Sequence, residues 1–271
     1  MLAVPNSDLT AGLEESPLFA EVGFAVQAAR RAGDLTLEAF EHRTFSMHSK
    51  ADGSPVTEAD VAAEALLRSE IGATFPADGI LGEEAGNHEG TNSRRWILDP
   101  IDGTRAFTRG VPTFATLLAL EVDSRAAVGV IYLPALGELL VAAAGGGTWL
   151  NGAPCRVSNL EDLSEYVAST SGYDYWAEPG LERLRSTGYA MRTWGDAWGH
   201  ALVASGRVEM MIDPVAWPWD LAAISVITTE AGGTFLGLDG TSSFDTGGGA
   251  SCTPALADVT ADVLRAAAGN P

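Results

Sequence analysis

The chain has 271 residues, of which 46% are hydrophobic and 19% charged, so it can bury a sizeable core and is not a disordered protein. Its 36 acidic residues outnumber its 16 lysines and arginines, and the formal charge of −20 excludes the basic footprint that a nucleic-acid partner requires. The two cysteines have no metal-binding spacing and no apolar stretch is long enough to span a bilayer, so we expect a reduced, cytoplasmic protein without a membrane partner.

The first part of the chain predicts two helices and then a series of short strands. Ser16-Pro17 predicts the start of a helix that continues to about Phe40, and a second helix is expected from Thr57 to Ile71. The stretch between them, residues 42–55, lacks periodicity and predicts a loop. Strands are expected at residues 79–81, 96–98, 114–122, 127–133, 138–144 and 148–150. The three long strands at residues 114–122, 127–133 and 138–144 predict an antiparallel meander, and Asn151-Gly152 predicts a hairpin turn.

Near Val157 the pattern changes to alternating strands and helices. Strands are expected at residues 166–169, 190–194 and 208–212, and helices at residues 179–186, 197–205, 221–231 and 254–268. The sequence therefore predicts an α+β half, residues 1–157, followed by an α/β half, residues 158–271.

A motif of two acids follows the apolar residues 96–98. Pro100 separates Asp99 from Asp102, biases Asp99 towards extended geometry and prevents one helical ladder from absorbing both acids. Two such carboxylates repel each other unless a cation lies between them, and hard oxygen ligands select Mg²⁺, Mn²⁺ or Ca²⁺. The amides after Asp102 open a helix, and a helix start attracts phosphate. The motif indicates metal-assisted phosphoryl chemistry. An ordinary Asp-Gly turn is the structural alternative.

Further acids stand at strand ends and helix starts. Glu83 and Glu84 follow the strand at residues 79–81, Asp60 opens the second helix, and Asp220 opens the helix at residues 221–231. Each has a structural alternative: a solvated surface position for Glu84, a capping box with Thr57 for Asp60, and a favourable charge at the helix start for Asp220. Because sites in layered α/β folds collect at such positions, their recurrence favours a common site.

These motifs resemble those of the inositol monophosphatase family. The resemblance rests on Gly82-Glu83-Glu84, Asp99–Thr104, Trp219-Asp220 with Glu230–Gly233, and the upstream motif Ser54–Asp60, and it spans about Ser16 to Leu238. Two further stretches, Phe107–Leu117 and Arg192–Gly199 continuing to Asp213-Pro214, resemble the histidinol-phosphate phosphatase branch. The resemblance implies a layered α-β-α-β-α sandwich of mixed α+β and α/β class, with an antiparallel meander in the first half, a mixed sheet in the second, and the site between them. It also implies a homodimer.

The resemblance implies a set of metal ligands. Glu83, Asp99 and the Ile101 carbonyl would hold one Mg²⁺. Asp99, Asp102 and Asp220 would hold a second Mg²⁺, with Asp99 bridging the two. A third, weaker ion would use Glu83 and waters, and Mn²⁺ is expected to substitute for Mg²⁺.

The same resemblance implies the catalytic and phosphate-binding groups. Asp60 and Thr104 would orient and help to deprotonate the water that attacks phosphorus. Asp102 and the amides of Gly103 and Thr104 would lie against the phosphate oxygens. Hydrolysis would then need no covalent phospho-enzyme.

The substrate pocket is expected to contain acidic and aromatic groups, because histidinol phosphate carries an ammonium and an imidazole. Asp213 matches the family position that contacts the non-phosphate part of the substrate. Asp196 is a second candidate, with helix N-capping as the alternative, and Arg109 either contacts substrate or pairs with a surface acid. We expect one tryptophan among residues 194, 198, 217 and 219 to reach the ligand, and a surface role for Lys50.

The function expected from the sequence is the Mg²⁺-dependent hydrolysis of a small phosphate ester. L-Histidinol phosphate, an intermediate of histidine biosynthesis, is the first candidate substrate. Inositol 1-phosphate or another sugar phosphate is the alternative. A non-catalytic metal or phosphate sensor is a more remote alternative, since a sensor need not retain the pair Asp60 and Thr104.

Overall fold

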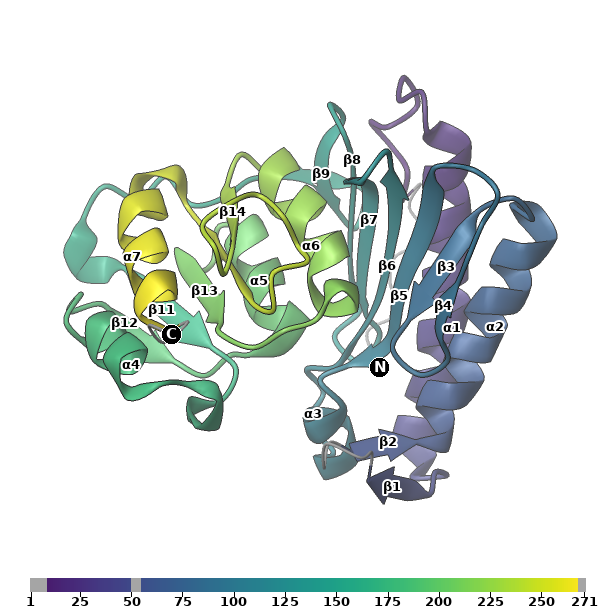
Figure 1. The fold of residues 1–271 in the computed structure, drawn as a ribbon, viewed down its shortest axis with the longest axis horizontal. Coiled ribbons are helices and arrows are strands. Elements are labelled where there is room, and N and C mark those ends of the chain that lie inside the picture. The colour runs from purple at the N-terminus through teal and green to yellow at the C-terminus, as the bar shows by residue number, and fades with distance from the viewer. Residues whose placement is uncertain (1–8, 50–54, 268–271) are drawn as a thin grey trace.

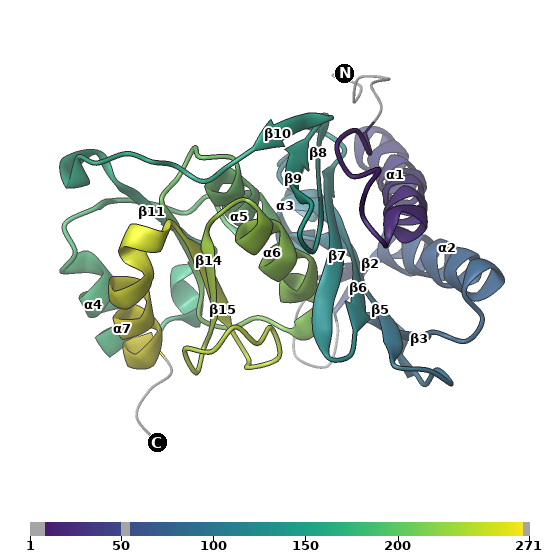
Figure 2. The same ribbon diagram turned by 90° about the horizontal axis from the view of Figure 1, so that it is seen from above.

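The computed structural model describes residues 9–49 and 55–267, so Lys50 and the start of the upstream motif lie outside the described residues. Five layers alternate between helices and sheets (Figures 1 and 2). One outer layer contains α1 (Phe19–His42) and α2 (Glu58–Thr74). The central layer contains α5 (Asp196–Ala204) and α6 (Pro218–Glu230), and the opposite outer layer contains α4 (Glu178–Arg185) and α7 (Ala257–Ala267). The α-β-α-β-α sandwich predicted from the sequence is confirmed.

An eight-stranded sheet lies between the first two helical layers, with the order β10-β9-β8-β7-β6-β5-β3-β4. Its strands are β3 (Gly79–Gly82), β4 (Gly86–His88), β5 (Arg94–Asp102), β6 (Ala115–Val122), β7 (Arg125–Leu133), β8 (Glu138–Ala143), β9 (Gly147–Leu150) and β10 (Ala153–Cys155). The predicted antiparallel meander corresponds to β6, β7 and β8, and it is part of a longer meander from β5 to β10. β3 pairs with β5 in parallel. The short helix α3 (Thr104–Arg109) follows β5 directly.

A five-stranded sheet forms the other β layer, with the order β12-β11-β13-β15-β14. Its strands are β11 (Val167–Thr170), β12 (Ala190–Arg192), β13 (Met210–Asp213), β14 (Thr234–Gly237) and β15 (Gly249–Cys252). Because β12, β11 and β13 are parallel while β15 is antiparallel to both of its neighbours, the sheet is mixed, as predicted.

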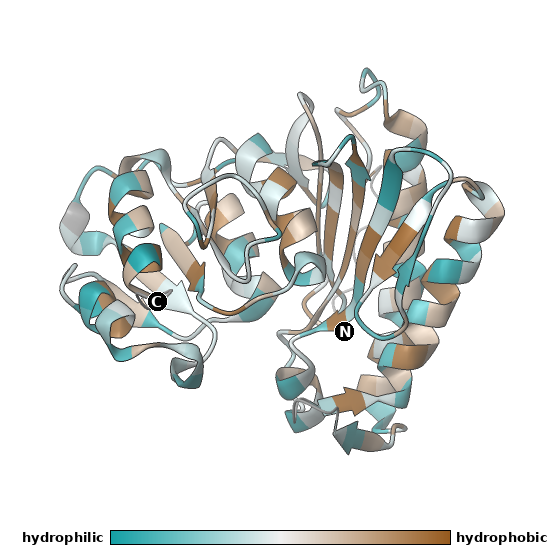
Figure 3. Cartoon of the chain, in the orientation of Figure 1, coloured by the Kyte–Doolittle hydropathy of each residue, from teal (hydrophilic) through white to brown (hydrophobic). Residues whose placement is uncertain are grey.

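The first sheet forms much of the hydrophobic core. Helices cover both of its faces, so its central strands are apolar on both sides. Seven consecutive residues of β6 are buried, which matches the nearly continuous apolar sequence of that strand. In Figure 3 the strands of this sheet carry much of the brown that marks hydrophobic residues. Helix α6 packs closely on β7 at Gly129, where an added Cβ would lie 2.5 Å from Val226 Cγ1 and 2.6 Å from the Ala223 carbonyl. The central helix is thereby held against the first sheet.

Several predicted boundaries were wrong for local reasons. Ser16 does not cap α1: its hydroxyl accepts a hydrogen bond from the Leu18 N–H in a preceding turn, and the helix begins at Phe19. Part of the predicted loop at residues 42–55 forms a hairpin of β1 (Met47–Ser49) and β2 (Pro55–Thr57), which lies beside α3 (Figure 1). The last helix is preceded by a 3-10 turn at Pro254–Leu256. Strands β4, β14 and β15 were not predicted.

The chain passes from the first sheet to the second between β10, which ends at Cys155, and β11, which begins at Val167. We propose on this basis that residues 1–157 and 158–271 are the two halves of the molecule. None of the helices described between residues 9 and 267 is long and apolar enough to cross a membrane.

Candidate active site

The acid motif lies where β5 ends and α3 begins. The pairing of β5 with β6 shifts register between Asp99, which pairs with Leu117, and Asp102, which pairs with Ala115, so a bulge separates the two acids. Asp99 Oδ1 accepts a hydrogen bond of 2.9 Å from the Ile101 N–H, which fixes the turn. Gly103 then adopts a left-handed φ of 78° and starts α3. β5 therefore extends through both acids instead of stopping at Leu98, and the bulge presents them.

Asp220 reaches the same place from the central helix α6. Pro218 occupies the first turn of that helix, and Asp220 Oδ2 accepts a hydrogen bond of 2.7 Å from the Trp217 N–H. Asp220 therefore does occupy the helix start, as the structural alternative predicted. Its carboxylate is also part of the acidic site. Ligand oxygens of Asp99, Asp102 and Asp220 all lie within 4.8 Å of one another. The structure thus joins Asp220 to two acids that precede it by more than 100 residues in the sequence.

Glu83 lies in the turn after β3, and its charge acts on Asp99 and Asp220, although its carboxylate is not among the three that lie within 4.8 Å of one another. Its position depends on the buried Glu64 of α2, whose carboxylate accepts hydrogen bonds of 2.8 and 2.9 Å from the N–H groups of Glu84 and Ala85. Arg68, one helical turn further on, pairs with Glu64 at 2.7 Å. Glu64 was not predicted from the sequence, although an acid at an apolar position of a helix, four residues before an arginine, is a visible irregularity.

Asp60 is both a capping residue and a member of the acidic site. Its Oδ2 accepts hydrogen bonds from the N–H and the hydroxyl of Thr57, at 2.8 and 2.5 Å, and so completes a capping box. Its Oδ1 is buried and has no hydrogen-bond partner among the described residues. Burial, opposed by the Thr57 hydrogen bonds and assisted by the charge of Glu83, raises the pKa of Asp60 to about 6.

Thr104 is the first residue of α3, and its hydroxyl donates a hydrogen bond of 3.0 Å to the Ile101 carbonyl. The hydroxyl proton of Thr104 is therefore used within the turn. The Ile101 carbonyl keeps one further lone pair, and the Thr104 oxygen still has acceptor capacity.

Burial and mutual repulsion dominate the electrostatics of the cluster. Burial and then the charges of Glu83 and Asp102 raise the pKa of Asp99 well above its ordinary value. Burial and then the charges of Asp196 and Asp220 do the same for the pKa of Asp102. Burial is also the main reason why the pKa of Asp220 rises to about 8. A divalent cation among these oxygens would remove the repulsion, and an all-oxygen donor set suits Mg²⁺ or Mn²⁺. The residues present therefore fit a metal centre.

Asp196 and Asp213 adjoin this cluster from the second half of the chain. Asp196 is the first residue of α5 with a left-handed φ of 56°, and Gly195 occupies the N-cap position, so Asp196 is not the capping residue. Its Oδ2 lies 3.2 Å from the Cβ position that a side chain at Gly103 would occupy. Asp102 Oδ2 accepts a 2.7 Å hydrogen bond from the Ala197 N–H, which ties the start of α5 to the acid motif. Burial and the neighbouring Asp213 raise the pKa of Asp196 to about 6.

Asp213 ends β13 and is buried. Its Oδ1 accepts a hydrogen bond from the Ser171 hydroxyl, and its Oδ2 lies 3.1 Å from His200 Nε2. Neither Ser171 nor His200 was assigned a role from the sequence, because their partners are distant along the chain. Asp213 contributes to the raised pKa values of Asp102, Asp196 and Asp220, so it lies within electrostatic reach of the cluster.

Arginines and tryptophans border the acids. The charge of Arg105, on the exposed side of α3, acts on Asp196 and opposes the rise of its pKa. Arg109, the arginine singled out from the sequence, is exposed in the last turn of the same helix. Trp194 and Trp217 are 37% and 56% exposed, so core packing does not account for these two rings. Trp217 stacks on Trp219 with ring centroids 5.7 Å apart.

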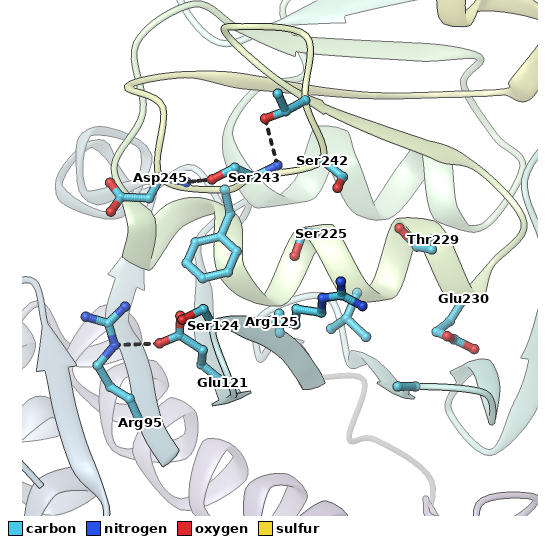
Figure 4. Close-up of a pocket in the computed structure, with 15 residues that line it drawn as sticks. Arg95, Glu121, Ser124, Arg125, Ser225, Thr229, Glu230, Ser242, Ser243 and Asp245 are labelled. Carbon is cyan, nitrogen blue, oxygen red and sulfur yellow. Dashed lines mark hydrogen bonds and ion pairs between the residues drawn. The ribbon is translucent and has the colours of Figure 1, made fainter. Parts of the chain in front are cut away.

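A cavity of about 810 Å³ lies elsewhere, between α6, the turn joining β6 to β7, and residues 241–245 (Figure 4). Arg95 and Glu121 form an ion pair of 2.7 Å at one side of it. None of the acids of the cluster lines this cavity. The chemistry therefore points to the acidic cluster and not to this cavity.

The chain is similar to known proteins in both sequence and structure. Residues 20–267 match the profile of the inositol monophosphatase family. The chain is 45% identical over 217 residues to the histidinol-phosphatase of Chlorobaculum parvum, which covers 79% of this chain and 84% of that protein. It is 41% identical over 225 residues to the histidinol-phosphatase of Mycobacterium tuberculosis, covering 80% and 86%. The solved structure of an IMPase from Thermotoga maritima matches with a TM-score of 0.82 and 31% identity, covering 90% of this chain and 96% of that one.

Proposed function

This chain belongs to the inositol monophosphatase family and is a phosphomonoesterase, and from that premise we propose that it hydrolyses L-histidinol phosphate to L-histidinol and phosphate with Mg²⁺. Relatives named histidinol-phosphatase, at 41% and 45% identity, support this substrate. The observation that carries the proposal is a buried, hydrogen-bonded carboxylate, Asp213, beside the acid cluster. A fixed negative charge there suits a leaving group that carries an ammonium.

We propose the ligand sets that the family resemblance implies. Glu83, Asp99 and the Ile101 carbonyl would hold one ion; Asp99, Asp102 and Asp220 would hold another; and Glu83 would contribute to a third, weaker site. The metal would supply positive charge to the phosphate oxygens and lower the pKa of a bound water. The short distance between oxygens of Asp99, Asp102 and Asp220, within 4.8 Å, supports their action as one group.

Asp60 is the proposed base. Its Oδ2 is held by Thr57, so the carboxylate has a fixed orientation, while its buried Oδ1 has no partner in the described part of the chain and can accept a proton from water. Thr104 donates to the Ile101 carbonyl, which leaves its oxygen able to accept a hydrogen bond from the same water. The two residues would thus orient the nucleophile from two sides without a direct bond between them.

The start of α3 is the proposed phosphate contact. The first helical hydrogen bond runs from the Phe107 N–H to the Gly103 carbonyl, so the amides of Gly103 and Thr104 precede the helical ladder. Amides in such a position suit phosphate oxygens. The carboxylate of Asp102 would take part through the metal.

The second candidate substrate is inositol 1-phosphate or another sugar phosphate, which the likeness to the Thermotoga maritima IMPase favours. The non-catalytic sensor is set aside, because the chain is a phosphomonoesterase.

Steady-state hydrolysis of both esters by the purified enzyme in Mg²⁺ decides between them. The proposal expects a higher kcat/KM for L-histidinol phosphate than for inositol 1-phosphate. The opposite preference would reject it and promote the second candidate, while the metal ligand assignment would stand.

We also propose a cytoplasmic homodimer. Cys155 and Cys252 are free thiols, which suits a reducing compartment, and the family resemblance implies the dimer. Analytical ultracentrifugation tests the oligomeric state, and a single species with the mass of one chain would contradict the dimer.

A further inference from the structure

A buried chain of polar side chains runs from the central helix α6 to the carboxylate of Asp213. Thr228 Oγ1 lies 2.7 Å from Ser251 Oγ, and Ser251 Oγ lies 2.8 Å from His200 Nδ1. The other ring nitrogen, Nε2, lies 3.1 Å from Asp213 Oδ2. Thr228, Ser251 and His200 are no more than 1% exposed, so these groups depend on one another for their hydrogen bonds.

The carboxylate of Asp213 at the end of this chain determines the direction of every hydrogen bond in it. A carboxylate only accepts, so His200 Nε2 carries a proton and donates to Asp213. In a neutral ring Nδ1 then accepts from the Ser251 hydroxyl, and Ser251 in turn accepts from Thr228. On the other side, Ser171 donates to Asp213 Oδ1 and accepts a 2.8 Å hydrogen bond from the Asp196 N–H. Each hydroxyl proton is used once, so the pattern is consistent from end to end.

The elements around His200 leave the ring little freedom. It projects from α5 over two paired strands, β13 and β15, on which Met211 lies opposite Ser251. The preceding residue, Gly199, packs so closely that an added Cβ would lie 2.2 Å from the Trp194 carbonyl and 2.5 Å from Met211 Sδ. The ring thus connects Ser251 on β15, through Nδ1, with Asp213 on β13, through Nε2.

We propose that His200 is a positioning residue for substrate selection, which holds Asp213 in one orientation so that this carboxylate binds the cationic part of the leaving group. The role rests on the proposed function, in which Asp213 contacts that part of the substrate. Both carboxylate oxygens are held by donors, the half-buried Ser171 and the buried His200, yet each oxygen keeps a second lone pair for a ligand. His200 therefore acts on binding through Asp213 and touches neither the phosphate nor the metal ligands.

Two amide substitutions form a matched pair that tests this role. In His200→Gln the amide nitrogen reaches about where Nε2 lies, and it can still donate to Asp213. In His200→Asn the shorter side chain places its amide near Ser251 and leaves Asp213 without that donor. We expect His200→Asn to raise KM for L-histidinol phosphate about 10-fold, the lower end for losing a hydrogen bond to a charged group, with a smaller change in kcat. His200→Gln should recover most of the loss.

A double-mutant cycle with Asp213→Asn identifies the route of the effect. If His200 acts through Asp213, His200→Asn should change KM by no more than about 2-fold in the Asp213→Asn background, because coupled residues are not additive. Ser251→Ala, which removes the donor to Nδ1, should raise KM in the same direction by a smaller factor. This variant also keeps the proposal testable if His200→Asn fails to fold.

The control is Tyr166→Phe, which removes a part-buried hydrogen bond of the second half, from the Tyr166 hydroxyl to the Leu160 carbonyl at 2.7 Å. It should leave KM unchanged.

Three results with His200→Asn would each overturn the positioning role: an equal loss on L-histidinol phosphate and inositol 1-phosphate, a fall in kcat at constant KM, or additive effects in the cycle. A wild-type preference for inositol 1-phosphate would reject the proposed substrate alone, since coupling of His200 to Asp213 measured on that ester would still support positioning.

Discussion

The acids of this molecule are held in two different ways. In the cluster of Asp99, Asp102 and Asp220, one oxygen of each carboxylate accepts a backbone N–H, from Ile101, Ala197 and Trp217 respectively. Asp213, by contrast, has both oxygens bound by side chains, those of Ser171 and His200. The first arrangement fixes each carboxylate and leaves an oxygen for a shared ligand. The second surrounds one carboxylate with donors and keeps its charge in place.

The electrostatics follow the same division. Burial and mutual repulsion raise the pKa values of Asp99, Asp102 and Asp220, and a small, highly charged cation is the group that best offsets such repulsion. Asp213 receives hydrogen bonds from the side chains of Ser171 and His200. We therefore propose that the cluster binds the metal and phosphate, whereas Asp213 selects the organic part of the substrate.

Removal of divalent metal should have the largest effect, because it affects the whole cluster. We expect exhaustive chelation to reduce hydrolysis to background and added Mg²⁺ to restore it, with Mn²⁺ as a substitute. Mg²⁺ should also raise Tm, since a ligand that binds only the folded state stabilises it, by about 2.7 kcal/mol at a hundred times Kd. Phosphatase activity that persists after chelation would refute the metal centre.

Asp99→Asn should have the next largest effect. The substitution keeps the shape of the side chain but removes a charge that the proposal shares between two cations, and we expect kcat to fall on the order of 10³-fold or more at saturating Mg²⁺. Both substrates should lose activity alike, because the reacting phosphate is common to them. Asp239→Asn, at an exposed acid bonded to Thr241, is the control and should behave like the wild type. Near-normal turnover in the Asp99 variant would contradict its assignment.

Much of the first region could be predicted from sequence because its determinants are local. The Asp99–Thr104 segment contains the proline, the glycine and both acids, and the structure adds the bulge that presents them. The apolar runs of β6, β7 and β8 likewise predicted the meander to within a few residues. Asp60 shows the limit of this approach, since one carboxylate serves as capping residue and site residue together.

The second region was less predictable because its determinants are distant along the chain. Ser171 meets Asp213 across 42 residues, and His200 meets Ser251 across 51. No spacing rule indicates such pairs; they arise when α5 packs on β13 and β15. β14 and β15 are four residues each and contain Gly237, Gly249 and polar residues, so neither has the alternating apolar pattern of a strand.

Asp213→Asn should distinguish the two substrates. Loss of a charge-assisted contact costs about 1.5–3 kcal/mol, or roughly 10- to 150-fold in kcat/KM for L-histidinol phosphate. Inositol 1-phosphate should be affected less, because an amide can still hydrogen-bond a hydroxyl. Asp196→Asn should act in the same direction if that carboxylate also faces the leaving group. Equal losses on both esters would mean that these acids only support the metal centre, and the contrast between the two regions would then fail.

Glu64→Gln should have the smallest effect, and it tests whether the first region depends on a residue that binds no ligand. Glu64 accepts from the N–H groups of Glu84 and Ala85 and pairs with Arg68 at 2.7 Å, so the change weakens the hold on the turn that carries Glu83. A net loss of about 1 kcal/mol corresponds to roughly a 5-fold higher Mg²⁺ concentration for half-maximal activity. Because added Mg²⁺ can compensate, kcat at saturation should stay close to that of the wild type, and KM for substrate should not change.

The matched control is Glu70→Gln on the same helix, which breaks a comparable pair with Arg31 at 2.6 Å away from the acids. An exposed pair of this kind contributes little, about 0–1 kcal/mol, and its loss should not alter the Mg²⁺ requirement. If Glu64→Gln and Glu70→Gln gave the same Mg²⁺ titration, the turn would hold Glu83 without help from Glu64. If Glu64→Gln instead raised KM for L-histidinol phosphate alone, the separation of metal binding from substrate selection would be wrong, because a change confined to the first region would have acted on the second.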